Sequence, residues 1–132
     1  MTMAPPAMDV DRLSNLVIGA AIEVHRHLGP GLLESVYEKA LQVELETQGI
    51  SCERQVPVPL IYKGVNLGAE YRIDMLVGGV LVVELKTVEA IAPIHEAQLL
   101  TYLKLTAHTV GLIINFNVPL LKDGIRRMVL AQ

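Results

Sequence analysis

Cysteine is almost absent from this chain of 132 residues. Cys52 is the single one, so neither an intramolecular disulfide nor a metal cluster held by several thiolates can form. Long apolar runs are missing as well, because Asn115 and Pro119 help to break the long uncharged stretch 106–121. A membrane-spanning helix needs roughly 20 apolar residues in a row. We therefore expect no membrane association.

Positive charge is also scarce. The chain has 11 Lys and Arg residues against 14 Asp and Glu residues, which gives a formal net charge of -3. Proteins that coat nucleic acid by charge alone depend on clustered Lys and Arg, and here the basic residues are scattered. Recognition of nucleic acid by this chain would have to depend on a localised site.

The N-terminal segment has neither the basic start nor the apolar core of a secretion signal. We expect residues 1–10 to be a disordered lead-in and residues 11–132 to form a single domain of a cytoplasmic protein. Apolar residues make up 52% of the chain, which is high for a soluble monomer. We therefore expect a homodimer or another homo-oligomer that covers some of the apolar surface.

Apolar periodicity predicts the helices. Residues 11–28 repeat apolar side chains at intervals of three and four, and a second helix is expected from about Leu32 to Gln48, ended by Gly49. Pro93 suits the first turn of a third helix that reaches about Leu105.

Extended segments fill the rest of the chain. They are expected at 50–62, as an edge or irregular strand because of its prolines, at both halves of 72–87, at 108–116 and at 125–130. The stretches 63–68 and 122–124 are predicted turns. This order, roughly α-α-β-β-β-α-β-β, predicts an α/β fold with a central mixed β-sheet flanked by helices.

The segment 72–87 carries charges on two otherwise apolar strands. If only Gly78 and Gly79 formed the loop, Asp74 would lie opposite Val83 and place a charge on the apolar face. A three-residue loop, 78–80, places Asp74 opposite Glu84 instead. Since glycines allow the left-handed residue that such loops use, we predict the three-residue loop.

This register brings Asp74, Glu84 and Lys86 into one small patch. Two neighbouring carboxylates repel each other unless a cation lies between them. Carboxylate oxygens suit Mg²⁺ or Mn²⁺, whose remaining positions are left for water and substrate phosphate. For Lys86 we expect a role in orienting the attacking water and stabilising charge on the phosphate, rather than a role as general base.

Three motifs carry a family resemblance. Asp74 followed by Glu84-Leu85-Lys86 resembles the D…(D/E)xK signature of the PD-(D/E)xK nuclease superfamily. The segment "GLLESVYE", residues 31–38, matches the signature of the GxxExxY protein family, and "HEAQLLTYL", residues 95–103, is similar to the Q-x-x-x-Y element of RecB-type nucleases. The motifs occur in the expected order along the chain.

The resemblance implies a restriction-endonuclease-like core and a Mg²⁺- or Mn²⁺-dependent nuclease. It implies that the catalytic and metal-binding groups are Glu34, Asp74, Glu84, the backbone carbonyl of Leu85 and, as a catalytic group, Lys86. From the residues alone, Glu34 could equally stabilise the start of its helix.

Substrate contacts are implied for a pair on the third helix. Gln98 and Tyr102 are spaced i, i+4 and so share one face, and the resemblance makes them substrate-binding. Nucleic acid, with DNA as the first expectation, is the implied partner. The alternative is a catalytically silent nucleic-acid-binding or protein-assembly module that retains the nuclease fold. Metal uptake through Asp74 and Glu84 would separate the two.

Overall fold

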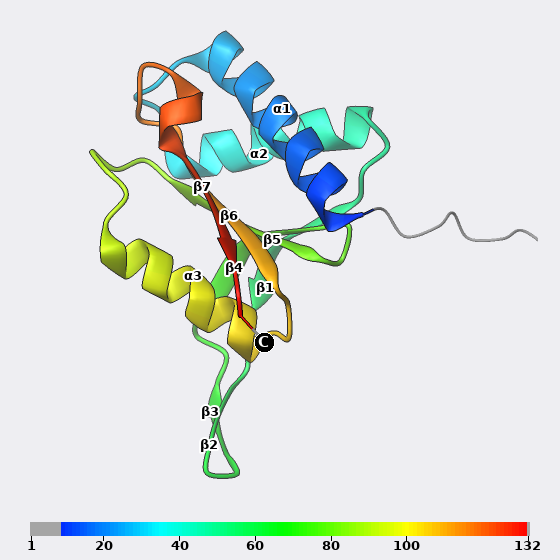
Figure 1. Cartoon of the computed structure of the whole chain (residues 1–132), viewed down its shortest axis with the longest axis vertical. Helices are drawn as coiled ribbons and strands as arrows, with labels where there is room; N and C mark the ends of the chain where they lie inside the picture. Colours follow the sequence, from blue (N-terminus) through cyan, green and yellow to red (C-terminus); the bar gives the residue numbers. More distant parts are fainter. Residues whose placement is uncertain (1–8, 132) are drawn as a thin grey trace, which may run out of the picture.

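The computed structural model describes residues 9–131 and packs helices on both faces of a sheet (Figure 1). The expected lead-in, residues 1–10, lies almost wholly outside these residues. The elements in chain order are α1 (Val10–Leu28), α2 (Glu34–Thr47), β1 (Cys52–Pro57), β2 (Leu60–Tyr62), β3 (Val65–Gly68), β4 (Arg72–Val77), β5 (Leu81–Lys86), α3 (Pro93–Leu105), β6 (Val110–Asn115), the short 3₁₀ helix η1 (Leu121–Gly124) and β7 (Ile125–Val129).

The helices end where local chemistry ends them. The side chain of Asp9 caps α1 by accepting a hydrogen bond of 2.9 Å from the backbone N–H of Asp11. Gly49 follows α2 with a left-handed φ of 74°, which is the conformation predicted for it. The three expected helices are confirmed; α2 begins two residues later than expected. None of the helices described is long and apolar enough to cross a membrane.

The main sheet has five strands in the order β1-β4-β5-β6-β7. β5 and β6 are parallel and joined through α3, whereas the other neighbours are antiparallel. This is the mixed sheet predicted from the order of the elements. β1 lies at one edge and ends at Pro57, as the prolines indicated, because proline cannot donate a hydrogen bond to a neighbouring strand.

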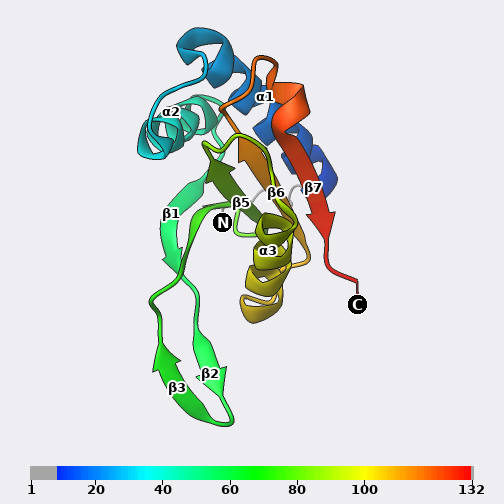
Figure 2. The same ribbon diagram turned by 90° about the vertical axis from the view of Figure 1, so that its left-hand side faces the viewer.

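Helices α1 and α2 lie on one face of this sheet and α3 lies on the other (Figures 1 and 2). The core therefore has two parts. Leu13, Val17 and Leu41 pack with Val83 and other side chains of the first face. Leu99 and Leu103 pack on the second face. Strand β6 is buried along its whole length, so the centre of the sheet is enclosed on both sides.

The hairpin between β4 and β5 has the predicted register. Its pairs run from Val77–Leu81 to Met75–Val83, which leaves a three-residue loop, 78–80. Gly78 and Gly79 both have positive φ, 60° and 73°. A Cβ atom at Gly78 would also lie 2.9 Å from a side-chain carbon of Leu13, so this position requires glycine for its backbone and for its packing.

A second hairpin was not expected. The stretch 63–68 was predicted to be a turn, but only Lys63 and Gly64 turn, and β3 begins at Val65. Strands β2 and β3 pair into a separate two-stranded arm that projects from the body beyond α3 (Figures 1 and 2). The turn was placed too broadly because Val65 and Leu67 are strand-forming residues between two glycines.

Candidate active site

Asp74 lies where two strands change the face they bury. On β1, Cys52 packs with the core on the α1 side, whereas Val56, four residues later, packs on the α3 side. On β4, Ile73 packs on the α3 side, whereas Met75, two residues later, packs on the α1 side. Between Cys52 and Val56 lies Gln55, with a left-handed φ of 55°. Strict alternation along β4, on which the sequence prediction relied, is therefore interrupted at the functional residue itself.

The Asp74 carboxylate is held by the backbone of the next strand. Its Oδ2 accepts a hydrogen bond of 2.8 Å from the N–H of Leu85. This bond orients the carboxylate beside Glu84, the residue just before Leu85. The sequence-based expectation that Asp74 and Glu84 lie together is met through this contact.

Glu84 is buried in the middle of the sheet. Only 4% of it is exposed, and its Oε1 has no hydrogen-bond partner among the described residues. Burial, and next the negative charge of Asp74, raise the pKa of Glu84 to about 9, while Lys86 acts in the opposite direction. In the metal-free chain the pKa of this carboxyl group therefore lies above neutral pH, which favours its protonated form even with Lys86 nearby.

Lys86 ends β5 at a point that the neighbouring strand fixes. The carbonyl of Lys86 accepts a hydrogen bond of 3.0 Å from the N–H of Phe116. Asn115, which pairs with Lys86 across the parallel strands, bonds both the N–H and the carbonyl of Val88 (3.1 and 2.8 Å). Buried Asn115 thus holds the backbone just after Lys86 in place, and Phe116 holds the carbonyl of Lys86 itself.

Within the motif at residues 31–38, Tyr37 has a structural role and Glu34 is the candidate site residue. Tyr37 is fully buried and stacks on Phe116, with ring centroids 4.4 Å apart. Its hydroxyl donates to the carbonyl of Gly29 (2.5 Å) and accepts from the N–H of Leu32 (3.1 Å). Tyr37 therefore ties down the loop that leads into α2 and sets the place at which Glu34 begins that helix.

Glu34 faces the same region as Asp74. Partial burial, followed by repulsion from Asp74, raises the pKa of Glu34, and the charge of Lys86 opposes that rise. Glu34, Asp74 and Leu85 line one hollow of about 310 Å³, together with Ser35, Glu38 and Gln55. We call this hollow the polar cavity. It brings together three of the groups that the sequence singled out.

Sequence reasoning did not single out three residues of the polar cavity, namely Ser35, Glu38 and Gln55. Glu38 is only 7% exposed and accepts a hydrogen bond of 2.9 Å from Gln55. An ion-pair contact to Arg54 is present at 3.9 Å. The i, i+4 spacing of Glu34 and Glu38 was the available signal, because it places both on one helix face.

The second predicted pair lies in a different hollow. Tyr102 is buried, and Gln98 lies one helical turn before it. They line a cavity of about 300 Å³ with Val58, Leu60, Tyr71, Ile94, Ala97, Thr101 and Leu105. We call it the aromatic cavity. Burial, and then the charge of Glu84, raise the pKa of Tyr102, with Asp74 contributing as well, so this cavity lies close to the carboxylates.

A family model described as "PD-(D/E)XK nuclease superfamily" matches residues 11–128. The chain belongs to this superfamily. Comparisons with curated proteins and with solved structures found no significant match. The superfamily assignment covers every candidate residue from Glu34 to Tyr102, and it agrees with the mixed sheet flanked by helices.

Proteins of the PD-(D/E)xK superfamily typically use divalent metal ions. Within residues 9–131, no three His, Cys, Asp or Glu side chains are clustered tightly enough to hold a metal as they stand. The donors nevertheless suit one. Carboxylate oxygens are hard ligands of the kind Mg²⁺ prefers, and buried Oε1 of Glu84 lacks a partner.

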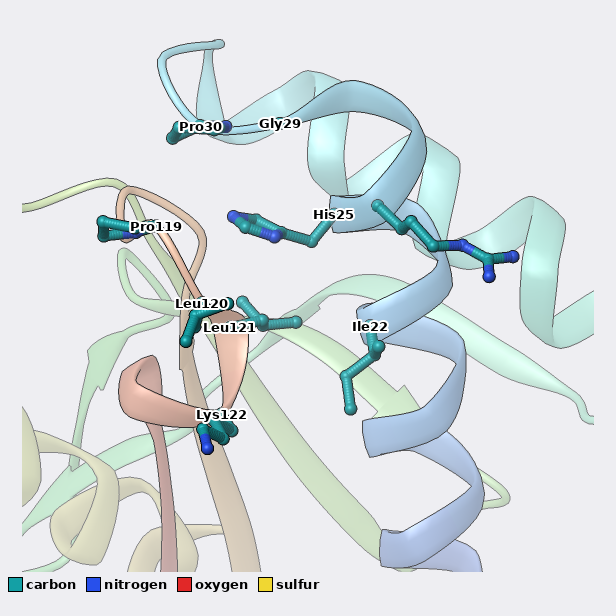
Figure 3. A pocket seen from close by; sticks show the side chains of 9 residues that line it. Ile22, His25, Gly29, Pro30, Pro119, Leu120, Leu121 and Lys122 are labelled. Carbon is teal, nitrogen blue, oxygen red and sulfur yellow. The ribbon is translucent and has the colours of Figure 1, made fainter.

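A larger cavity than these two lies elsewhere in this member of the superfamily. It measures about 480 Å³ and lies between the end of α1 and the loop before η1 (Figure 3). His25 points into it and contacts the carbonyl of Val118 through Nε2 at 2.8 Å. Its lining is mainly apolar, including Ile22 and Leu120, and holds none of the candidate catalytic residues. Volume alone therefore does not locate the active site.

Proposed function

We propose that this chain is a metal-dependent nuclease that hydrolyses phosphodiester bonds of nucleic acid. The observation that carries the proposal is the buried Glu84 carboxyl, which has an unpartnered oxygen beside Asp74 in the D…ExK arrangement. A structural role for Glu84 does not account for that oxygen, because buried polar atoms are normally hydrogen-bonded. Membership of the nuclease superfamily supports the same conclusion.

The groups that would hold Mg²⁺ or Mn²⁺ are Asp74, Glu84, the backbone carbonyl of Leu85 and Glu34. When bound, such an ion makes hydroxide accessible at neutral pH and polarises a phosphoryl oxygen. Glu34 reaches the site from a helix, whereas the other groups come from the sheet. Because the pKa of Glu84 is raised, the carboxyl group of Glu84 must lose its proton before its Oε1 atom can act as a metal ligand.

Lys86 would stabilise the phosphate as negative charge builds up on it. Its backbone is fixed by Asn115 and Phe116, so the ammonium group is presented from a rigid strand end. Groups that are already oriented before the reaction need no reorganisation at the moment charge develops. Lys86 would also orient the attacking water.

The finer family assignment is part of the proposal. The signature at residues 31–38 supports membership of the GxxExxY family, and Gln98 with Tyr102 supports a RecB-type site in which this pair contacts the substrate strand. DNA is the substrate we propose to test first.

Self-association is proposed through the projecting arm, where Ile61, Tyr62 and Val65 are at least 60% exposed. Sedimentation of an Ile61→Lys variant would test it.

Cleavage of labelled single- and double-stranded DNA and RNA, with Mg²⁺ or Mn²⁺, tests the main proposal. We expect wild type to cut and Lys86→Ala to lower kcat by at least about 100-fold, the effect of removing one preorganised charge donor. Asp74→Asn should do the same and should also weaken Mn²⁺ binding in calorimetry. Lys104→Ala, which removes an exposed lysine of α3, is the matched control.

The opposite result is equally clear. If wild type cuts none of these substrates with either metal, or if Lys86→Ala cuts as well as Lys104→Ala, the nuclease proposal is wrong. Circular dichroism of each variant shows whether a loss of cleavage comes from unfolding.

A further inference from the structure

The aromatic cavity has features that the catalytic proposal does not use. The rings of Tyr71 and Tyr102 lie at its wall with centroids 6.4 Å apart and planes inclined at 50°. Tyr71 is 52% exposed and Ile94 is 70% exposed. These two large side chains contribute little to the core, yet they surround a hollow whose volume is about 300 Å³.

The chemistry of this wall excludes some occupants. Its described lining residues carry no formal charge, so a phosphate group has no cation there to bind. The aromatic rings and the aliphatic Ile94 provide flat apolar surface. The amide of Gln98 and the hydroxyls of Thr101 and the tyrosines can both donate and accept hydrogen bonds. A flat heteroaromatic ring with polar edges matches this combination.

The position of the aromatic cavity relates it to the proposed cleavage centre. Tyr71 lies three residues before Asp74, and Tyr102 experiences the charges of both Glu84 and Asp74. A nucleotide whose phosphate is at the carboxylates therefore has its own base, or the next one, within reach of this hollow.

We propose that the aromatic cavity binds one unpaired nucleobase next to the phosphate that is cut, so that the substrate is single-stranded at that position. The inference rests on the proposed nuclease function and adds the substrate class. A base inside a duplex is stacked and paired, so it cannot enter a side cavity without being extruded. Unpaired bases stack readily on tyrosine rings, with little dependence on sequence.

The test removes either the base or the ring. The substrates are single-stranded oligonucleotides in which one abasic site is moved stepwise along the strand. The value of kcat/KM for their cleavage is measured for wild type, Tyr71→Ala and Tyr71→Phe. We expect one abasic position to lower kcat/KM by about 5- to 100-fold, the range for loss of one stacked base. Tyr71→Ala should cause a similar loss on the intact strand, and Tyr71→Phe should retain stacking.

The loss of kcat/KM caused by the abasic site and the loss caused by Tyr71→Ala should not multiply when the two changes are combined. If the base and the Tyr71 ring contact each other, Tyr71→Ala adds little further loss on the oligonucleotide that already lacks the base. A merely structural role of Tyr71 would lower cleavage of both oligonucleotides equally. Val43→Ala is the control, because Val43 is 61% exposed on α2, outside both the aromatic cavity and the arm.

Each failure has its own signature. If intact strands are cleaved but no abasic position matters, or if Tyr71→Ala is equally damaging with and without the base, the inference is wrong and the nuclease proposal stands. If Tyr71→Ala instead changes the sedimentation coefficient and leaves cleavage unchanged, the aromatic cavity binds a second copy of the chain. If no strand is cleaved or bound, both proposals fail together.

Discussion

Two hollows of nearly equal volume lie next to the Asp74–Glu84 pair, and their walls differ completely. The polar cavity, of about 310 Å³, is lined by carboxylates and an amide, whereas the aromatic cavity, of about 300 Å³, is lined by tyrosines and aliphatic side chains. One suits a cation and a phosphate, and the other suits a ring. The difference suggests a division between the chemistry of cleavage and the recognition of the substrate.

The strands β1 and β4 change the face they bury close to this division. Asp74 and Gln55 lie at the point where both strands exchange the side of the sheet they bury. Asp74 therefore lines the cavity on the α2 side, while Tyr71, three residues earlier, lines the cavity next to α3. Because side chains alternate along a strand, residues three apart point to opposite faces. The face change instead leaves Asp74 on the same side of the sheet as its neighbour Met75, which packs in the core on the α1 side.

The largest expected effect comes from removing the charge of Glu84. Glu84→Gln keeps the shape of the side chain but leaves a neutral amide, so we expect cleavage to fall by about 10²- to 10³-fold. Binding of single strands through the aromatic cavity should change much less. Kinetics and fluorescence anisotropy measure the two effects separately. Glu46→Gln, on the exposed surface of α2, is the control. If Glu84→Gln weakens single-strand binding as much as it slows cleavage, the division between cleavage and substrate recognition is wrong.

The second effect is on stability and pH. Glu84 has a pKa of about 9 in the folded chain, well above the ordinary value of 4.5. Between these values the folded state keeps a proton that the unfolded state has lost, so stability is full below about pH 4.5 and falls as pH rises toward 9. The slope approaches about 1.4 kcal/mol per pH unit.

Urea unfolding of the metal-free protein between pH 5 and 9 measures this slope. Glu84→Gln should flatten it and make the protein more stable than wild type at pH 8, because an amide needs no proton to be buried neutral. Equal slopes in both proteins would show that Glu84 titrates normally.

Tyr37→Phe should have the third-largest effect. The variant loses the hydroxyl that contacts Gly29 and Leu32, two hydrogen bonds in a partly buried setting, each of which contributes about 0.5–1.5 kcal/mol to the free energy of unfolding. Cleavage should fall too, since this loop sets the start of α2 and hence Glu34, while the aromatic cavity stays intact. Tyr62→Phe, on the exposed arm, is the matched substitution; if both variants unfold at the same urea concentration, the clamp is unimportant.

Sequence reasoning succeeded where the signal is local. The register of the β4–β5 hairpin follows from matching polar with polar residues around Gly78 and Gly79, and both partners lie within a few residues of the turn. The same holds for the helices, whose apolar spacing and end residues lie within each segment. The membership of Glu34 and Asp74 in one hollow was reached through family motifs.

What sequence reasoning missed depends on distant contacts. The burial of Glu38 depends on Gln55, which is 17 residues away and has a left-handed backbone that its residue type does not announce. The Nδ1 atom of His95 accepts a hydrogen bond of 2.9 Å from the N–H of Ala92. The ring of His95 thus caps the start of α3. A histidine at this position in the sequence does not by itself indicate such a cap.

The smallest expected effect separates the aromatic cavity from the core. Ile94 is 70% exposed, so Ile94→Ser should change the unfolding free energy by no more than about 0.5 kcal/mol, as surface substitutions do. If Ile94 contacts a bound base, the same variant weakens single-strand binding measurably while leaving Mn²⁺ affinity unchanged. Leu99→Ser, one turn further along α3 but fully buried, should instead destabilise the fold strongly. Loss of stability in Ile94→Ser comparable to that of Leu99→Ser would place Ile94 in the core and remove it from the recognition surface.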